Sequence, residues 1–353
     1  MTAMRRIIST TLRNWKAPME MPGWLSTIVV VILAFLIGGM LILAIGANPI
    51  QAYLALADAA FGSVNGFAET MVKACPLLFA GLGISLAYRA QFWNIGAEGQ
   101  IYAGGILAAV VGIYLKGLPM TLHLPLTLLA GLAGGAVWGF IPGILKARLR
   151  VNEIITTLML NYIMIQLTAY LVHVPMRDMS SGITISPQLM SSAWLPMVIP
   201  RTRFHLGILL AVGAALLFHW VIYKTVLGYQ IRAVGENRRA ARLAGIRVEQ
   251  IIVWTVVLSG ALAGLAGAAE VSGVQRRLVE DFSPGYGYLA IAVALLGNLE
   301  PIGVIFASIL FAALLNGADA MQRAVAVPVP VIYVIEGLVI IFIAIRAFAR
   351  KAF

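Results

Sequence analysis

The sequence predicts an all-α integral membrane protein with about ten transmembrane helices. Of its 353 residues, 61% are hydrophobic and only 11% are charged, and the mean hydropathy is +0.94. Soluble domains carry about a quarter charged residues. Apolar runs recur along the whole chain, and no polar stretch is long enough for a separate soluble domain. We therefore expect residues 1–353 to form a single membrane domain.

Ten apolar runs define the predicted spans. They lie near 25–45, 74–88, 99–115, 121–145, 154–174, 205–223, 251–273, 285–297, 301–318 and 329–346. The first run is too long for a signal-peptide core, so we expect it to be retained as a span. The run at 285–297 is too short to cross a ~30 Å hydrocarbon core at ~1.5 Å per residue. It is expected to be re-entrant or a half-helix.

The basic residues predict the orientation. With the N-terminus inside, 17 of the 25 lysines and arginines fall on the inner side and 8 on the outer side, as the positive-inside rule requires. This places segments 1–23, 224–250 and 347–353 in the cytoplasm. The net charge of +11 therefore reflects topology and contacts with anionic lipid, and it does not indicate nucleic-acid binding.

The sequence lacks the motifs of catalytic and metal sites. A single cysteine, Cys75, excludes an internal disulfide and a multi-thiolate metal site. The four histidines are isolated, so no metal site is expected. No GxxxxGK[ST] phosphate loop is present, so the chain is not expected to hydrolyse ATP by itself. We expect no catalytic residues and no cofactor.

Glycines at four-residue spacing indicate close helix packing. They recur at positions 131, 135, 139 and 143 in one span and at 260 and 264 in another. Small residues at this spacing allow two helix backbones to approach closely.

Polar residues within the spans are candidates for a pathway or for structural bonds. Glu270 and Glu336 are costly in hydrocarbon. For Glu270, pairing at the outer interface fits as well as a pathway role. For Glu336, a structural hydrogen bond between helices fits as well as a pathway role. Asn161, Gln166 and Asn316 fit a cavity-facing position, although interhelical hydrogen bonds suit each of them better. The outer loop at 175–203 fits either a short amphipathic helix or an ordinary interfacial loop.

Two polar segments stand out from the hydrocarbon. Residues 89–100 are polar and broken by glycine, and irregular backbone at membrane depth occurs only where it is buried in protein or lines a cavity. Residues 232–246 carry several arginines with a small apolar face, a capping pair Glu236-Asn237, and a helix stop at Gly245. The first segment indicates a translocation pathway, and the second indicates a docking element on the inner side.

Together these two segments resemble a known family. The stretch FWNIGAEGQ at 92–100 and the stretch RAVGEN…AA…AGI at 232–246 resemble permease subunits of bacterial ABC importers, in the sugar, nucleoside and branched-chain amino acid group. The first stretch is most similar to the nucleoside and simple-sugar subgroup, whose binding proteins are of the basic membrane lipoprotein type. The chain departs from the pattern at Trp93, which stands between Phe92 and Asn94 where many members have Phe directly before Asn.

The resemblance implies a dimeric helical permease in the bacterial inner membrane, multi-pass and with both termini cytoplasmic. Cytoplasmic ABC ATPase subunits would bind ATP and Mg²⁺, a second related permease or a copy of this chain would complete the pathway, and an extracytoplasmic lipoprotein would deliver a nucleoside or simple sugar. The residues implied in coupling to the ATPase are Arg232, Gly235, Glu236, Asn237, Ala240, Ala241, Ala244 and Gly245. The candidates for the pathway are Phe92, Trp93, Asn94, Glu98, Gln100, Asn161 and Glu336.

Two other functions remain open on the sequence alone. An ion-coupled secondary transporter would use Glu270 or Glu336 and would contain inverted repeats, none of which is evident. A membrane receptor or assembly subunit without transport would leave the broken polar segment at 89–100 unexplained.

Overall fold

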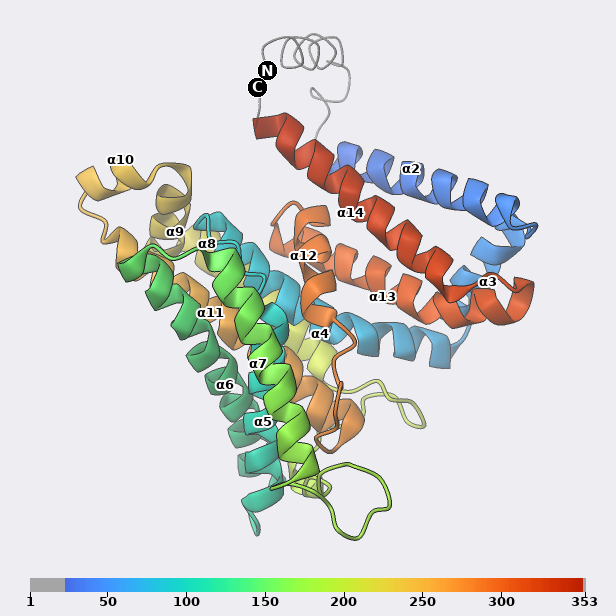
Figure 1. The fold of residues 1–353 in the computed structure, drawn as a ribbon, viewed down its shortest axis with the longest axis horizontal. Helices are drawn as coiled ribbons and strands as arrows, with labels where there is room; N and C mark the ends of the chain where they lie inside the picture. Colours follow the sequence, from blue (N-terminus) through green and yellow to red (C-terminus); the bar gives the residue numbers. More distant parts are fainter. Residues whose placement is uncertain (1–22, 352–353) are drawn as a thin grey trace. The chain divides into compact units, whose positions relative to one another are not determined.

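A computed structural model describes residues 23–351, and these residues fold almost entirely into helices (Figure 1). The described part contains no β-strand, only two isolated β-bridges. The predicted cytoplasmic N-terminal segment lies almost wholly outside the described residues, as do the last two residues of the predicted tail. The helices are α2 (Gly23–Ala44), α3 (Pro49–Phe61), α4 (Val64–Arg89), α5 (Ala97–Tyr114), α6 (Met120–Leu149), α7 (Glu153–His173), η1 (Ser191–Ala193), α8 (Gly207–Lys224), α9 (Val226–Glu236), α10 (Arg238–Leu243), α11 (Val248–Ala269), η2 (Glu270–Gln275), α12 (Tyr286–Leu296), α13 (Pro301–Val325) and α14 (Val329–Lys351).

The ten predicted apolar runs correspond to helices of the structure. Within the described residues, eight helices are long and apolar enough to cross a membrane, and Tyr286–Leu296 and Pro330–Phe342 form shorter apolar helices. The prediction of an all-α membrane protein is confirmed. Helix α3 and the first turns of α4 were not predicted, because their polar residues interrupt the apolar pattern.

The chain packs as two units. The first unit comprises the residues up to Leu56 and those from Ala318 onward. In it, α2 packs against α14, with Gly38 directly against the side chain of Ile335. The Tyr53 hydroxyl donates to the carbonyl oxygen of Phe35 at 2.6 Å, which joins α3 to α2. The single-domain organisation expected from the sequence stays a prediction.

The second unit, Ala57–Gly317, is organised around α11, which packs against α4, α5 and α6. Glycines make the closest of these contacts. A Cβ atom added to Gly135 would overlap the carbonyl oxygen of Gly260, and one added to Gly264 would overlap that of Gly131. The predicted role of these glycines in packing is confirmed, because only a residue without a side chain permits such an approach.

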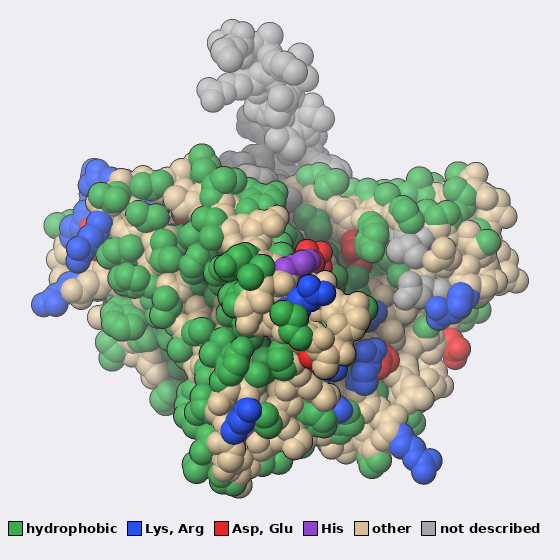
Figure 2. Space-filling view, turned by 60° about the horizontal axis from the view of Figure 1, so that its bottom comes forward, with side chains coloured by type: hydrophobic (Ala, Val, Ile, Leu, Met, Phe, Trp, Pro, Cys, Tyr) green, Lys and Arg blue, Asp and Glu red, His purple; other side chains and the backbone are tan. Residues whose placement is uncertain are grey.

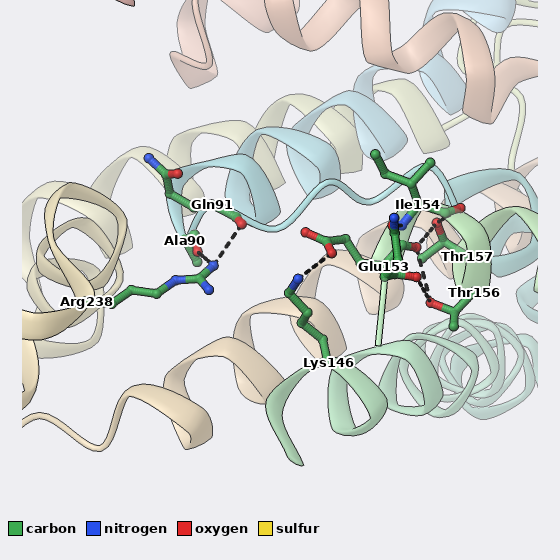
Figure 3. Close-up of polar contacts among 9 residues, drawn as sticks. Ala90, Gln91, Lys146, Glu153, Ile154, Thr156, Thr157 and Arg238 are labelled. Atoms are coloured by element: carbon green, nitrogen blue, oxygen red, sulfur yellow. Dashed lines mark hydrogen bonds and ion pairs between the residues drawn. The ribbon is translucent and has the colours of Figure 1, made fainter. Parts of the chain in front are cut away.

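The junction between α6 and α7 positions α7 on the outside of this core. Arg150 adopts a left-handed conformation (φ 55°) and ends α6. The Asn152 side chain then accepts a hydrogen bond from the Ile154 amide at 2.9 Å and caps α7. Lys146 pairs with Glu153 at 2.5 Å across the junction (Figure 3). Helices α6 and α7 therefore leave the same end of the unit as neighbours (Figure 1).

Helix α12 is short, as the length of its apolar run predicted, and we refer to it as a half-helix. Its 11 residues span only about 16 Å at 1.5 Å per residue. An irregular segment, 276–285, leads from η2 to the start of α12 within the second unit (Figure 1). The outer loop forms a single 3₁₀ turn at Ser191–Ala193 in place of an amphipathic helix. Apolar side chains cover most of the visible surface, and charged ones gather in a few small groups (Figure 2).

Candidate functional site

The predicted coupling segment forms a helical tip at one end of the second unit (Figure 1). Thr225 caps α9 by accepting a hydrogen bond from the Gly228 amide at 3.2 Å. Asn237 separates α9 from α10, and its side chain accepts hydrogen bonds from the amides of Arg239 and Ala240, both at 3.0 Å. Gly245 ends the tip in a left-handed conformation with φ of 81°. We call residues 236–245 the tip. Capping residues at both of its ends define it.

The outer side of the tip is apolar. Ala240, Leu243 and Ala244 are exposed, and Leu243 reaches 87%. Their spacing of three and four residues puts them on one side of the turn, whereas Ala241 faces inward at 4% exposure. The arginines 239 and 242 flank this patch and are exposed. The tip therefore presents a small apolar surface with a basic rim.

The tip is attached to the turn after α4. Gly235 lies so close to the Arg89 carbonyl oxygen that an added Cβ atom would overlap it. The Arg238 guanidinium donates to the carbonyl oxygen of Gln91 at 2.9 Å and approaches that of Ala90 at 3.5 Å (Figure 3). Gln91 is left-handed, with φ of 57°. Displacement of the tip would therefore act directly on residues 89–91.

Arg89 extends this connection to the loop that follows α12. Its guanidinium donates to the Leu299 carbonyl oxygen at 3.0 Å and to Glu300 at 2.7 Å. The Tyr223 hydroxyl at the end of α8 donates to the same carboxylate at 2.6 Å, and Arg232 lies over the Tyr223 ring at 5.4 Å. One charged cluster therefore holds the ends of α4, α8 and α12 together with α9.

The turn between α4 and α5 is held by buried side-chain amides. Asn94 donates to Gln100 and to Ser259 of α11, both at 2.9 Å, and accepts a hydrogen bond from the Gly96 amide at 3.1 Å. Asn94, Gln100 and Ser259 are all fully buried, and so is Phe92. Satisfied amides of this kind fix the irregular backbone of a buried turn.

Glu98 and Asn161 join the start of α5 to two further helices. Glu98 accepts a hydrogen bond from the Gly287 amide in the first turn of α12 at 2.6 Å, where the helix dipole favours an anion. Asn161 of α7 accepts from the Gly99 amide at 2.8 Å and donates to the Tyr288 hydroxyl at 3.1 Å. The segment 92–100 is thus a joint between α5, α7, α11 and α12.

A buried histidine marks the opposite end of the unit, in the loop before α8. The Nδ1 atom of His205 accepts a hydrogen bond from the Gly207 amide at 3.1 Å, and His205 pairs with Met197 in an isolated β-bridge. Its Nε2 atom has no hydrogen-bond partner among the described residues. Burial lowers the pKa of His205 to about 4, because the apolar surroundings disfavour the imidazolium.

Comparison with known families identifies the family of this chain. Residues 66–344 match the family described as the permease component of the branched-chain amino acid transport system. The chain belongs to this family of ABC transport permeases. Its matched region covers the 92–100 joint and the tip as well as most spans, so the permease is a multi-pass translocation component.

Relatives match the permease over nearly its whole length. The guanosine ABC transporter permease protein NupP of Bacillus subtilis is 37% identical over 90% of this chain and 92% of its own. The glucose ABC transporter permease protein TsgB13 of Haloferax volcanii is 35% identical over 94% and 90%. The nucleoside ABC transporter permease protein NupB of Lactococcus lactis is 34% identical over 90% of both chains. No solved structure matches.

The predicted site residues of the permease fall into distinct groups. Three of the coupling residues face the helices behind the tip, namely Arg232, Gly235 and Ala241. The other five are exposed, namely Glu236, Asn237, Ala240, Ala244 and Gly245. Most of the pathway candidates are buried in the joint, namely Phe92, Asn94, Glu98, Gln100 and Asn161. Trp93 is 42% exposed and its ring contacts that of Tyr88.

The two intramembrane acids of the permease belong to different units. Glu336 is buried in α14 of the first unit, and its Oε1 atom has no hydrogen-bond partner among the described residues. Glu270 begins η2 in the second unit and accepts from Gln275 at 3.4 Å. Asn316 bonds the carbonyl oxygens of Ala59 and Gly66, both at 3.1 Å, as expected of an interhelical bond.

The sequence placed Leu243 on the small apolar face of the predicted docking element, but it did not single out Arg238. Leu243 carries most of the exposed apolar surface of the tip, and Arg238 attaches the tip to Gln91. Nothing in the sequence distinguishes Arg238 from its neighbour Arg239, since only the folded turn brings a carbonyl oxygen within its reach.

Proposed function

We propose that this chain is the permease subunit of an ATP-driven importer that passes nucleosides or simple sugars into the cytoplasm. It sits in the bacterial inner membrane with both termini inside. An extracytoplasmic lipoprotein delivers the solute, and a second, related permease or a copy of this chain completes the pathway. ATP and Mg²⁺ bind to separate cytoplasmic ABC ATPase subunits, and this chain holds no cofactor. The guanosine, glucose and nucleoside permeases among its relatives support this substrate class.

The exposed apolar patch on the tip is the observation that carries the proposal. In the predicted orientation, Ala240, Leu243 and Ala244 project into the cytoplasm. Burying a leucine side chain contributes about 2 kcal/mol, and the flanking arginines add charge for orientation. The ATPase covers this patch, so the tip moves when nucleotide binding closes the ATPase pair.

Motion of the tip passes into the bundle through named contacts. Gly235 and Arg238 contact residues 89–91. Arg89 in turn donates hydrogen bonds to Leu299 and Glu300, which follow α12. The joint at 92–100 then carries the displacement to the start of α5 and to the first turn of α12. Each step is a direct contact, so the route needs no catalytic residue in this chain.

Reconstitution of this chain with the ATPase, the second permease and the lipoprotein encoded by neighbouring genes tests the proposal. Uptake of radiolabelled guanosine and glucose would be measured in proteoliposomes with ATP on the ATPase side. The wild-type complex should import one of these solutes, and Gly245→Leu should retain complex assembly but lose uptake, because a β-carbon strains the left-handed position. Uptake that persists without any ATPase subunit would contradict an ATP-driven importer and favour ion coupling.

A further inference from the structure

Helices α6 and α7 expose different chemistry along their lengths. Between Leu122 and Phe140 the exposed side chains of α6 are hydrocarbon, among them Leu126, Leu129 and Val137. Along α7, exposed aliphatic side chains such as Ile163 and Leu167 are interspersed with Tyr162 at 55%, Tyr170 at 57% and the exposed Gln166 between them. The two helices are neighbours of similar hydropathy, so hydropathy alone does not separate their surroundings.

The three polar residues of α7 form one ridge. Their four-residue spacing keeps them on one side of the helix, over about 12 Å of its length. Gln166 lies near the middle of Glu153–His173, and it makes no hydrogen bond to another described residue. An unpaired carboxamide in hydrocarbon costs several kcal/mol. Lipid is therefore an unsuitable neighbour for this side of α7.

Tyr288 of the half-helix α12 adds to the same surface. Its hydroxyl accepts the hydrogen bond from Asn161, the residue before Tyr162, and its side chain is 37% exposed. We define the α7 polar face as Tyr162, Gln166, Tyr170 and Tyr288. Between Glu153 and His173 the helix contains no charged residue, so this face offers rings and one amide without a formal charge.

We propose that the α7 polar face lines the aqueous translocation path and contacts the solute during passage. Tyrosine rings stack on the flat face of a base or a sugar ring, and the Gln166 amide donates to and accepts from its polar edge. An uncharged solute with hydrogen-bonding groups fits this face. The solute class rests on the proposed function, whereas the exposure of the face to water does not.

Thiol labelling tests the exposure to water in the assembled importer. Gln166→Cys would be compared with Leu129→Cys and Val137→Cys on α6, which expose 58% and 63% of their native side chains. The native Cys75 is buried, and the whole series would carry Cys75→Ala. A membrane-impermeant methanethiosulfonate should label position 166 more than about tenfold faster than either α6 position, since hydrocarbon excludes water and charge.

The labelling outcomes separate this proposal from the proposed function. Reaction of position 166 with a lipid-soluble maleimide only would overturn the assignment, because it would place the face in lipid. Reaction with neither reagent would also overturn it, because it would place the face in a dry protein contact. Neither outcome depends on uptake, so a failure of guanosine and glucose import would leave the labelling result unaffected.

A kinetic measurement tests contact with the solute. Gln166→Leu should raise the KM for uptake about tenfold, a loss of ~1.4 kcal/mol of binding, while the amount of assembled complex and its ATPase activity are kept. The matched variant Leu129→Met on α6 should leave KM unchanged. An unchanged KM for Gln166→Leu would overturn the contact, and Gln166→Asn should recover part of the loss.

Discussion

The tip at 236–245 is bonded through Arg238 to Gln91, the residue before the joint at 92–100, yet the tip and the joint are built in opposite ways. The joint buries its polar side chains and pairs them with Gln100, Ser259 and helix amides. The tip exposes its apolar side chains, and Leu243 has little contact with the rest of the chain. The joint satisfies its polar groups within this subunit, whereas the tip exposes the surface that we propose an ATPase covers. Substitutions in the two regions should therefore fail in different assays.

The largest expected effect is on the tip. Leu243→Asp removes an apolar side chain worth about 2 kcal/mol of burial and puts a charge in the interface. ATPase binding should weaken by roughly a hundredfold or more, while the melting temperature of the isolated permease stays unchanged. Binding would be measured by co-purification and by titration of labelled ATPase onto permease in nanodiscs. Leu216→Asn on α8 is the control outside the tip, and wild-type ATPase binding by Leu243→Asp would refute the docking assignment.

The next effect is on the joint and should appear in stability. Asn94→Leu leaves Gln100 and Ser259 without their buried partner, at a cost of about 2–3 kcal/mol. A lower unfolding temperature of the detergent-solubilised permease is expected. Trp93→Phe, next to it and half-exposed, should melt like wild type. Equal melting of Asn94→Leu and wild type would mean that the joint does not depend on these amides.

Arg238→Ala cuts the connection between the two regions. The lost charged hydrogen bond to the Gln91 carbonyl oxygen contributes about 1.5 kcal/mol. We expect ATPase binding and the melting temperature to persist while uptake per ATP hydrolysed falls several-fold. Arg247→Ala, whose side chain is exposed outside the tip, is the control. Full coupling in Arg238→Ala would show that motion passes by another route.

Glu98→Gln keeps the shape of the joint and changes its hydrogen-bonding groups. The amide oxygen can still accept from Gly287, but an amide nitrogen replaces the second carboxyl oxygen, an effect of about 1 kcal/mol. Uptake should fall modestly and complex assembly should be normal, as measured by transport rate per assembled complex. Loss of assembly with transport intact in the remaining complex would make Glu98 purely structural.

The smallest effect concerns pH and lies outside both regions, since neither contains a histidine. His205 has a pKa lowered to about 4, below the ~6.5 of the unfolded chain. Its contribution to stability is therefore full above pH ~6.5 and is lost as the pH falls towards 4, by about half a kcal/mol between pH 7 and 6. Thermal melts of His205→Gln should lose this acid dependence. Identical pH profiles for the variant and wild type would refute it.

The sequence was sufficient for features with a local physical cause. Length predicted that 285–297 is too short for a full span, spacing predicted the packing of Gly135 on Gly260, and the capping roles of Asn237 and Gly245 followed from their residue types. Burial and facing were not predictable. Asn161 and Gln166 are both amides on α7, but one is buried and bonded while the other is exposed. Only tertiary packing separates them, just as it separates Arg238 from Arg239.

The glycine contacts among α5, α6 and α11 also limit how the second unit can rearrange. Gly104, Gly131, Gly135, Gly260 and Gly264 bring three backbones together with no side chain between them, and backbones so close cannot slide without collision. These three helices must then turn as one block. Opening and closing of the path are left to the elements around that block, and the short α12, supported at both ends by charged contacts, is the segment placed to tilt.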